Sequence, residues 1–422
     1  MHVQGNRGCM PHEIAIIGCG TAGLAAGLYL ARDGHRVTLF ERFTKPAPVG
    51  AGLLLQPTGL ACLAALGLDA EILAAGAHVR HLYGRTATGR TIFDISYQNL
   101  HPALFGLGIH RGALFGTLHN EAIRQNLKII TGCDVTDTRI AGDRREILNK
   151  AGAVQGVFDL VVDASGAQST LRAGHGQMKY NRPYPYGAVW GVCLDPDQSF
   201  GQDVLQQRYD GAGVMIGALP IGKRPGDGRE TLAFFWSLPV AHYGTWREAG
   251  LDVWRDKVLA YWPEMASLVA QFTNIDDLTF ARYNDVMMRQ WHGDHLVFIG
   301  DAAHCTSPQL GQGANLGLMD AMTLAAVLRE QKNIPDALAA YAAARKSQIK
   351  FYQVASRWLT PFFQSDNQAA AWLRDMAFST MCKTPYVRTQ MMRTLGGIKT
   401  GVFTHMNPGQ IHKDYDVQRR RA

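Results

Sequence analysis

The chain has 422 residues, of which 47% are hydrophobic and 18% charged, so it can bury more than one domain core, and two interleaved domains are expected. Its net charge is +7, but no basic stripe is interleaved with stacking aromatics, so nucleic acid is not an expected partner. The seven cysteines are scattered and never spaced C-x-x-C, which argues against a disulfide framework or a zinc site and favours a reducing cytoplasm.

A strand-helix-strand unit opens the chain. Residues 13–17 predict a buried strand, residues 21–33 a helix and residues 36–40 a second strand. The uncharged run 14–31 is long enough to be mistaken for a membrane span, but its four glycines would weaken a lone membrane helix. We therefore expect no membrane span. Residues 1–10 are expected to form a flexible extension.

A nucleotide-binding turn lies between this first strand and helix. The letters GCGTAG fit Gly-x-Gly-x-x-Gly in the required context. Gly18 permits the tight turn, Gly20 lets the backbone approach a pyrophosphate, and Gly23 allows close helix packing. The amino end of the helix, at Thr21 and Ala22, attracts negative charge.

An acidic residue completes the dinucleotide pattern. Glu41 follows the second strand, 21 residues beyond Gly20, where such an acid holds the ribose hydroxyls of a dinucleotide. The turn and the acid together predict a bound dinucleotide. Which dinucleotide it is stays open at this point.

The middle of the chain mixes three kinds of element. A short amphipathic helix is expected at 60–66, a strand meander at 80–99, a helix at 112–125 and a buried strand at 158–166. The aromatic-rich stretch that follows predicts a substrate domain with strands at 186–194, 214–222 and 231–238 and a helical stretch near 252–273. Aromatics such as Tyr186, Trp190, Tyr209 and Trp236 could line a cavity, but core packing is the expected role of each.

A second glycine-rich cradle lies far along the chain. Residues 295–304 predict a strand followed by a turn, residues 313–331 a long helix, and further helices continue to about 399. The loop PQLGQGAN leads directly into the long helix. Such a loop offers backbone N–H groups to an anion. A dehydrogenase that binds only a nicotinamide dinucleotide does not need a second loop of this kind.

This second motif resembles the para-hydroxybenzoate hydroxylase and ubiquinone-hydroxylase family of FAD monooxygenases, in which Gly-Asp is followed by Pro-x-x-Gly-Gln-Gly-x-Asn. The match covers Asp301, Pro308, Gly311, Gln312, Gly313 and Asn315. The resemblance implies that Asp301 contacts the ribityl or pyrophosphate part of FAD. It also implies that Pro308 and the backbone from Gly311 to Ala314 lie against the isoalloxazine, where helix N–H groups stabilise a reduced flavin.

Two arginines extend the resemblance. ERFTKPAPVGAGLLLQP at 41–57 is similar to the family's second strand and following turn, and HRGALFGTL is similar to its flavin-contacting helix. Arg42 and Arg111 are therefore predicted to bind anionic groups. The alternative for each is a solvated surface arginine.

The predicted fold class is α/β, with a Rossmann-like FAD-binding domain built from discontinuous segments, an inserted, mostly antiparallel β-sheet substrate domain and C-terminal helices. The expected bounds are 11–79, 102–177 and 284–332 for the FAD-binding domain, 80–101 and 178–283 for the substrate domain, 333–400 for the helices, and 1–10 and 401–422 for flexible termini. A monomer or small homodimer is expected.

The resemblance implies an FAD-dependent monooxygenase that uses NADH or NADPH and dioxygen to hydroxylate a small aromatic substrate through a flavin C4a-hydroperoxide. One motif departs from the family, because DASG at 163–166 stands where Gly-Ala-Asp-Gly is usual. This leaves a halogenase, a reductase or dehydrogenase, or a non-catalytic flavin-binding protein as alternatives. The halogenase motif Trp-x-Trp-x-Ile-Pro is missing.

No metal ion and no catalytic base is assigned. The histidine pairs His78/His81 and His292/His295 have H-x-x-H spacing without the cysteine or carboxylate partners of a metal site. Substrate identity, regiochemistry and the choice between NADH and NADPH stay open.

Overall fold

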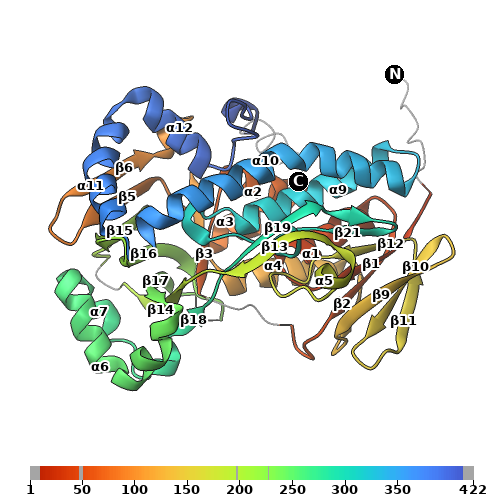
Figure 1. Cartoon of the computed structure of the whole chain (residues 1–422), viewed down its shortest axis with the longest axis horizontal. Coiled ribbons are helices and arrows are strands. Elements are labelled where there is room, and N and C mark those ends of the chain that lie inside the picture. Colours follow the sequence, from red (N-terminus) through yellow and green to blue (C-terminus); the bar gives the residue numbers. More distant parts are fainter. Residues whose placement is uncertain (1–9, 47–50, 196–197, 227, 412–422) are drawn as a thin grey trace.

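The computed structural model describes residues 10–46, 51–195, 198–226 and 228–411. Residues 1–9 and 412–422 of the expected flexible termini, and residues 47–50 of the stretch at 41–57, lie outside this part. Two sheets stand side by side in an elongated molecule, and two long helices run along its top (Figure 1). Among the described residues no helix is both long and apolar enough to cross a bilayer.

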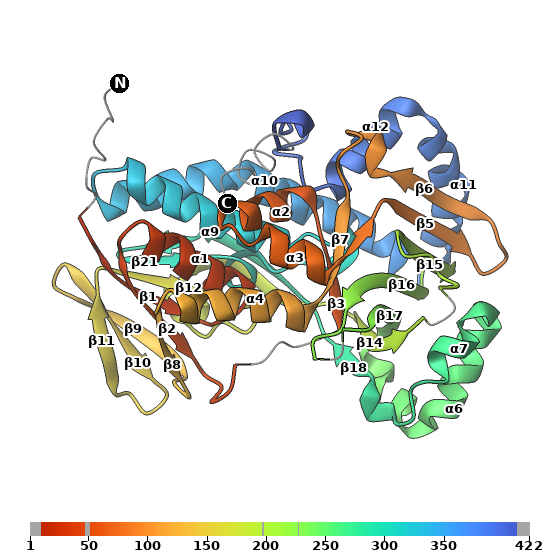
Figure 2. The same cartoon turned by 180° about the vertical axis from the view of Figure 1, so that it is seen from behind.

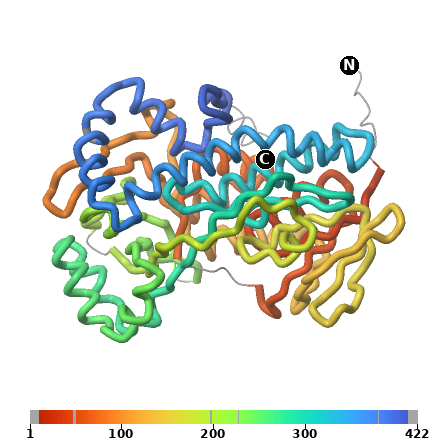
Figure 3. The backbone as a smooth tube through the Cα atoms, in the orientation of Figure 1, coloured from red at the N-terminus to blue at the C-terminus, as the bar shows by residue number. Residues whose placement is uncertain are grey.

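The first sheet has six strands and is parallel except at one edge. Its strands pair in the order β20 (His292–Gly293), β21 (Leu296–Phe298), β12 (Leu160–Asp163), β1 (Glu13–Ile17), β2 (Arg36–Glu41) and β8 (Lys128–Thr131), with only β20 antiparallel to its neighbour. The four central strands are buried on both faces, which explains why they read as continuous apolar runs. Segments far apart in the chain thus meet in one sheet, as Figure 3 shows.

Helices cover one face of this sheet and pack on the core formed by residues such as Ile14 and Ile16. They are α1 (Thr21–Arg32), α2 (Pro57–Ala65), α3 (Asp69–Ala75), α4 (Arg111–Arg124), α9 (Gly313–Glu330) and α10 (Ile334–Phe363). The helix expected at 60–66 begins three residues earlier, because Pro57 at its first turn has the φ that a helix start needs.

The other face is covered by a small antiparallel sheet that the sequence did not predict. Its strands are β9 (Val135–Ala141), β10 (Arg144–Asn149) and β11 (Val154–Phe158). Val135, Ile147 and Phe158 join a buried cluster with Ala15 and Ile17 of β1.

The second sheet has seven strands, and the strands expected at 186–194, 214–222 and 231–238 all lie in it. The pairing order is β18 (Thr279–Ala281), β14 (Tyr186–Leu194), β17 (Glu230–Pro239), β16 (Val214–Lys223), β15 (Val204–Asp210), β5 (His81–Thr86) and β6 (Thr91–Ser96). Its outer face carries α6 (Tyr243–Tyr261) and α7 (Ala266–Val269). The predicted range of 252–273 for a helical stretch is therefore wrong, because the helix starts at Tyr243 and is interrupted at Trp262.

Short elements join the two sheets. A three-stranded sheet of β3 (Gly52–Leu55), β7 (Gly106–His110) and β4 (Ala77–Val79) packs on β16, where a Cβ on Gly108 would lie 1.8 Å from the Pro220 carbonyl oxygen. The chain crosses between the sheets in the ribbon of β13 (Gln177–Pro183) and β19 (Asn284–Gln290). α5 (Leu171–His175) and α8 (Asp301–His304) are short, the latter replacing part of an expected turn.

The chain ends in helices α11 (Gln368–Lys383) and α12 (Pro385–Leu395), which lie at the far end of the seven-stranded sheet (Figure 2). The described residues after them return to the body of the protein. Lys399 pairs with His405, and Ile411 is buried. Within residues 401–411 only Ile411 is buried, whereas Val402 and Phe403 are exposed.

Candidate functional site

The turn between β1 and α1 has the backbone that a phosphate cradle needs. Gly18 has φ +102°, and its N–H donates to the Phe40 carbonyl at 2.7 Å. A Cβ on Gly23 would lie 2.0 Å from the Gly18 carbonyl oxygen, whereas a Cβ on Gly20 would meet nothing within 4 Å. Gly20 and the start of α1 at Thr21 and Ala22 therefore border open space at the amino end of a helix.

Glu41 lies beside this turn at the end of β2. Its side chain is buried and accepts hydrogen bonds from the backbone N–H groups of Cys19, at 2.9 Å, and Phe43, at 3.1 Å. These two bonds orient the carboxylate at the edge of the turn. Each of its oxygens keeps acceptor capacity for a further donor, such as a ribose hydroxyl.

Burial makes the thiol next to Glu41 unreactive. Burial and then the charge of Glu41 raise the pKa of Cys19 to about 12. The other described cysteines are also buried and free, and burial raises their pKa. They are Cys62, Cys133, Cys193, Cys305 and Cys382.

Because the thiolate is the nucleophile, a Cys9→Ser variant should not react with Ellman's reagent while folded. Once denatured, it should release six equivalents of thionitrobenzoate. A rapidly reacting thiol in the folded variant would contradict this prediction.

The second cradle begins where β21 ends. Gly300 has φ +59°, and the exposed carboxylate of Asp301 starts α8. Gly311 has φ +61° at the end of the turn that contains the exposed Pro308. Helix α9 then starts at Gly313, where the atom nearest to an added Cβ would be the Asp301 Oδ1, at 3.6 Å.

The two glycine turns lie together because their helices pack closely. Ala22 of α1 fits between two glycines, since a Cβ on Gly300 or Gly317 would approach the Ala22 Cβ at 3.1 or 3.2 Å. Helices α1 and α9 contact each other, and Figures 1 and 2 show α9 directly above α1. The turn after β1 and the loop before α9 therefore border the same edge of the sheet.

Two predicted site residues use their side chains inside the protein. Gln312 donates to the Leu395 carbonyl at 2.7 Å. Asn315 accepts from the Gln56 N–H at 2.9 Å and donates to the Gly311 carbonyl at 3.0 Å. Both side chains are buried, so they fix the loop and leave the backbone from Gly311 to Ala314 to face a ligand.

The two predicted arginines are exposed. Arg42 lies over the Phe43 ring, 4.7 Å from its centroid. Arg111 starts α4, and its N–H donates to the Ala51 carbonyl at 3.1 Å. His110 caps that helix by accepting from the Gly112 N–H at 3.0 Å. Both side chains are therefore exposed to solvent.

The DASG segment supports the first turn from beneath. Asp163 is buried and accepts from the N–H and hydroxyl of Ser165 and from the hydroxyl of Ser169. Burial raises its pKa, and the two serines partly offset this. The buried Arg172 donates to the carbonyls of Ala302 and Ala167, both at 2.7 Å. Asp163 therefore serves the protein interior and does not face the cradle.

One face of the seven-stranded sheet is an aromatic floor. One row across it consists of directly paired residues, namely Thr279, Trp190, Phe235, Gly217, Gln207, Gly84 and Phe93. A Cβ on Gly217 would lie 2.0 Å from the Phe235 ring, so the glycine lets that ring lie across the sheet. Trp190 and Phe235 are 4.9 Å apart between centroids.

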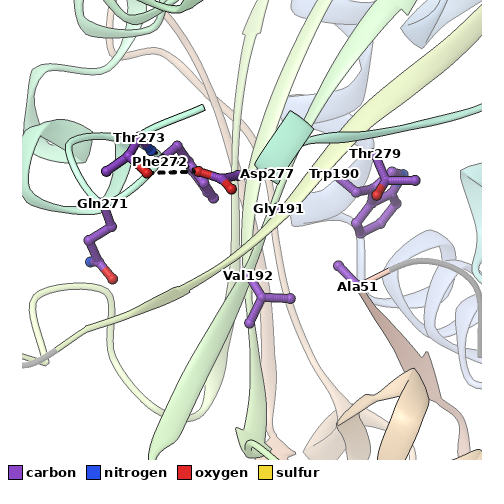
Figure 4. Close-up of a pocket in the computed structure, with 9 residues that line it drawn as sticks. All are labelled: Ala51, Trp190, Gly191, Val192, Gln271, Phe272, Thr273, Asp277 and Thr279. Carbon is purple, nitrogen blue, oxygen red and sulfur yellow. Dashed lines mark hydrogen bonds between the residues drawn. The ribbon is translucent and has the colours of Figure 1, made fainter. Parts of the chain in front are cut away.

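A cavity of about 440 Å³ adjoins this floor. Figure 4 shows Trp190 and Thr279 on the same side of it as Ala51, and Gln271, Phe272, Thr273 and Asp277 on the other side. The Asp277 carboxylate already accepts from the N–H groups of Thr273 and Asn274. These bonds hold Asp277 within its own loop.

The sequence missed Tyr283, which lies in the connection that follows β18. Its hydroxyl accepts from the Trp190 indole N–H at 3.1 Å. Burial raises the Tyr283 pKa, and Trp190 and the charge of Arg111 offset this in part. Its backbone carbonyl accepts from the Tyr184 N–H at 2.9 Å, and the Tyr184 hydroxyl lies near Thr306 and Ser307. These tyrosines link the floor to the second cradle.

The remaining expected aromatics pack elsewhere. Trp236 lies in the core under α6, Tyr209 is buried beside Phe363, and the Tyr186 hydroxyl donates to Asp366. Among the described residues no group of three or more His, Cys, Asp or Glu could hold a metal ion.

The residues present fit FAD. The open space at Gly20, the oriented carboxylate of Glu41 and the exposed carboxylate of Asp301 supply the contacts that a dinucleotide needs. A second backbone cradle before α9 lies at the same edge, next to an aromatic floor.

The chain matches the family described as FAD binding domain over residues 12–353. It is 28% identical to the aurachin C monooxygenase/isomerase of Stigmatella aurantiaca over 87% of this chain and 94% of the relative. It is 26% identical to the 3-hydroxybenzoate 6-hydroxylase 1 of Aquipseudomonas alcaligenes over 89% of this chain and 96% of that relative. The crystal structure of Klebsiella pneumoniae HpxO with FAD and uric acid superposes with a TM-score of 0.77 at 20% identity. The superposition covers 93% of this chain and 98% of that structure. The chain therefore belongs to the FAD binding domain family and is an FAD-dependent monooxygenase.

Proposed function

We propose that the protein inserts one oxygen atom into a small aromatic or heteroaromatic substrate that lies between the flavin and the aromatic floor around Trp190. The observation that carries this proposal is the position of Trp190, which lines the cavity and is hydrogen bonded to Tyr283 near Arg111. When bound and reduced by NADH or NADPH, FAD supplies the activation of dioxygen. The names of the relatives above, which include a hydroxybenzoate hydroxylase, agree with an aromatic substrate.

In this proposal the residues around the cofactor have separate tasks. Gly18, Gly20, Gly23 and the start of α1 hold the pyrophosphate, Glu41 holds the adenosine ribose, and Arg42 and Arg111 contact anionic groups. Asp301 contacts the ribityl chain or pyrophosphate. Pro308 and the backbone from Gly311 to Ala314 lie against the isoalloxazine, where N–H groups of α9 stabilise negative charge.

The protein's own part in the reaction is positioning and exclusion of water. The floor residues Trp190 and Phe235 offer flat apolar surfaces to an aromatic ring. Tyr283 keeps its phenolic proton, because its pKa is raised, and this proton is free for a polar atom of the substrate. We place the substrate domain at 80–101 and 178–283 and the FAD-binding domain in the segments 11–79, 102–177 and 284–332. The seven-stranded sheet takes its strands from the first set and the six-stranded sheet from the second, and the ribbon of β13 and β19 joins the two sets.

The test is oxygen consumption by the FAD-loaded protein with NADH or NADPH and a panel of phenols and nitrogen heteroaromatics. At least one compound should speed flavin reduction and return a product heavier by one oxygen atom. A Tyr283→Phe variant should lose about five- to tenfold in kcat/KM, as expected for one lost hydrogen bond, while Tyr261→Phe on the outer face should not. Recovery of all consumed oxygen as hydrogen peroxide with every compound in the panel would count against oxygen insertion.

A further inference from the structure

The C-terminal helices expose a group of large apolar side chains. Trp358 on α10 is 74% exposed, Trp372 on α11 is 62% exposed, and Tyr386 at the start of α12 is 72% exposed. Leu373, Met376 and Met381 of α11 are exposed as well. We call Trp358, Trp372, Leu373, Met376, Met381 and Tyr386 the C-terminal aromatic face.

These side chains are exposed because the helices use their opposite sides for packing. Ala371, Arg374 and Cys382 of α11 are buried, and α11 contacts β6. Trp372 and Met376, four residues apart, lie on the outward side of the helix. Figures 1 and 2 show α11 and α12 together at one end of the molecule, with the β5–β6 hairpin on the other side of α11.

Positive charge is concentrated in the same part of the chain. Residues 346–422 contain 12 of the 42 Lys and Arg residues but only 4 of the 35 Asp and Glu residues. The preceding 345 residues contain 30 basic and 31 acidic residues. Exposed Lys350 and Lys383 lie on the helices of the aromatic face itself. The excess of basic over acidic residues therefore lies in residues 346–422, which include α11, α12 and the second half of α10 as well as residues outside the described part.

We propose that the C-terminal aromatic face docks the protein on the surface of an anionic lipid bilayer. Tryptophan and tyrosine are the side chains that favour the boundary between lipid and water. Leucine and methionine bury apolar area among the acyl chains, and the lysines attract anionic headgroups. Helices with an apolar side, a basic character and a packed opposite side lie in the plane of such a surface.

Charge favours a bilayer over a second copy of the chain. A two-fold interface brings the same patch of each subunit against itself. The basic residues of α10, α11 and α12 would then face their own copies and repel each other. Interface cores are also depleted in lysine, whereas an anionic bilayer pairs those charges with headgroups.

The test is sedimentation of the FAD-loaded full-length protein with vesicles. The protein should sediment with vesicles of equal parts phosphatidylglycerol and phosphatidylcholine and stay in solution with phosphatidylcholine alone. Added salt should weaken the binding, because it screens the headgroup charge. The variant Trp358→Ala/Trp372→Ala, and separately Lys350→Glu/Lys383→Glu, should bind the anionic vesicles at least about tenfold more weakly.

Matched controls change exposed residues elsewhere. Lys128→Glu/Lys257→Glu makes the same change of charge on β8 and α6, and Ile123→Ala/Val253→Ala removes exposed apolar groups from α4 and α6. Both should bind like the unchanged protein, and all variants should keep its flavin spectrum and melting temperature. Failure of the unchanged protein to bind the anionic vesicles would overturn the proposal. So would a dimer in sedimentation velocity that only the tryptophan variant dissociates.

Discussion

A Gly20→Val variant should fold normally without cofactor but bind FAD at least about a hundredfold more weakly, a loss of about 2.7 kcal/mol. Gly20 has φ −76° and ψ −176°, which valine adopts without strain, and a Cβ there meets no atom within 4 Å. The space that the side chain would enter is the one assigned to the pyrophosphate. Titration of apoprotein with FAD and urea unfolding of the same apoprotein measure the two quantities.

Two glycines provide the controls for this prediction. Gly116 in α4 also has open space around an added Cβ, so Gly116→Val should change neither FAD affinity nor folding by more than about 0.5 kcal/mol. Gly18→Ala should destabilise the apoprotein itself, because φ is +102° and the new Cβ would lie 2.7 Å from the Ala164 carbonyl oxygen. Undiminished FAD affinity in Gly20→Val would mean that the pyrophosphate does not lie at this turn.

Local sequence patterns predicted the elements that form the two cradles. The strand and helix around Gly18 and the helix from Gly313 follow from apolar runs, glycines and strong helix formers. The strand 186–194 has the same bounds in the structure, because it alternates between two covered faces. In these segments the residues that form the element also determine how it packs.

Features that depend on distant partners were not predictable in this way. Strands β9 to β11 carry mixed polar and apolar residues, so their pattern resembles that of a surface loop until they pair. Tyr283 lies in a connection, and its place beside Trp190 depends on the pairing of β18 with β14. The direction of the Asp163 side chain, into the protein, likewise depends on serines in the next turn.

Asp320 is the centre of a buried polar cluster. The sequence did not predict this role, because a single acidic residue in an apolar helix matches no known motif. Asp320 is fully buried in α9, and one oxygen accepts from Arg345 at 2.7 Å. The other accepts from the Gly300 N–H at 2.8 Å and lies 2.6 Å from the His304 ring nitrogen. This carboxylate therefore anchors the turn that presents Asp301.

An Asp320→Asn variant should lose about 3–5 kcal/mol of unfolding free energy, because Arg345 would keep a buried charge without its partner. Burial raises the Asp320 pKa, but His304 and Arg345 outweigh it and lower the pKa to about 2. A depressed pKa gives stability that is present above the unfolded value near pH 4 and lost as the pH falls toward 2. Urea unfolding should show this acid loss, on the order of 2–3 kcal/mol, in the unchanged protein and not in the variant.

A second substitution separates the lost charge pair from a general disturbance of α9. Adding Arg345→Met to Asp320→Asn removes the unpaired charge and should restore a large part of the stability, since apolar replacements of buried ion pairs are well tolerated. Asp256→Asn on the exposed side of α6 should stay within about 0.5 kcal/mol of the unchanged protein. If the double variant is no more stable than Asp320→Asn alone, the cost lies in the hydrogen bonds to Gly300 and His304 and not in the stranded arginine. The anchoring of the Gly300 turn would then be the main contribution of this carboxylate.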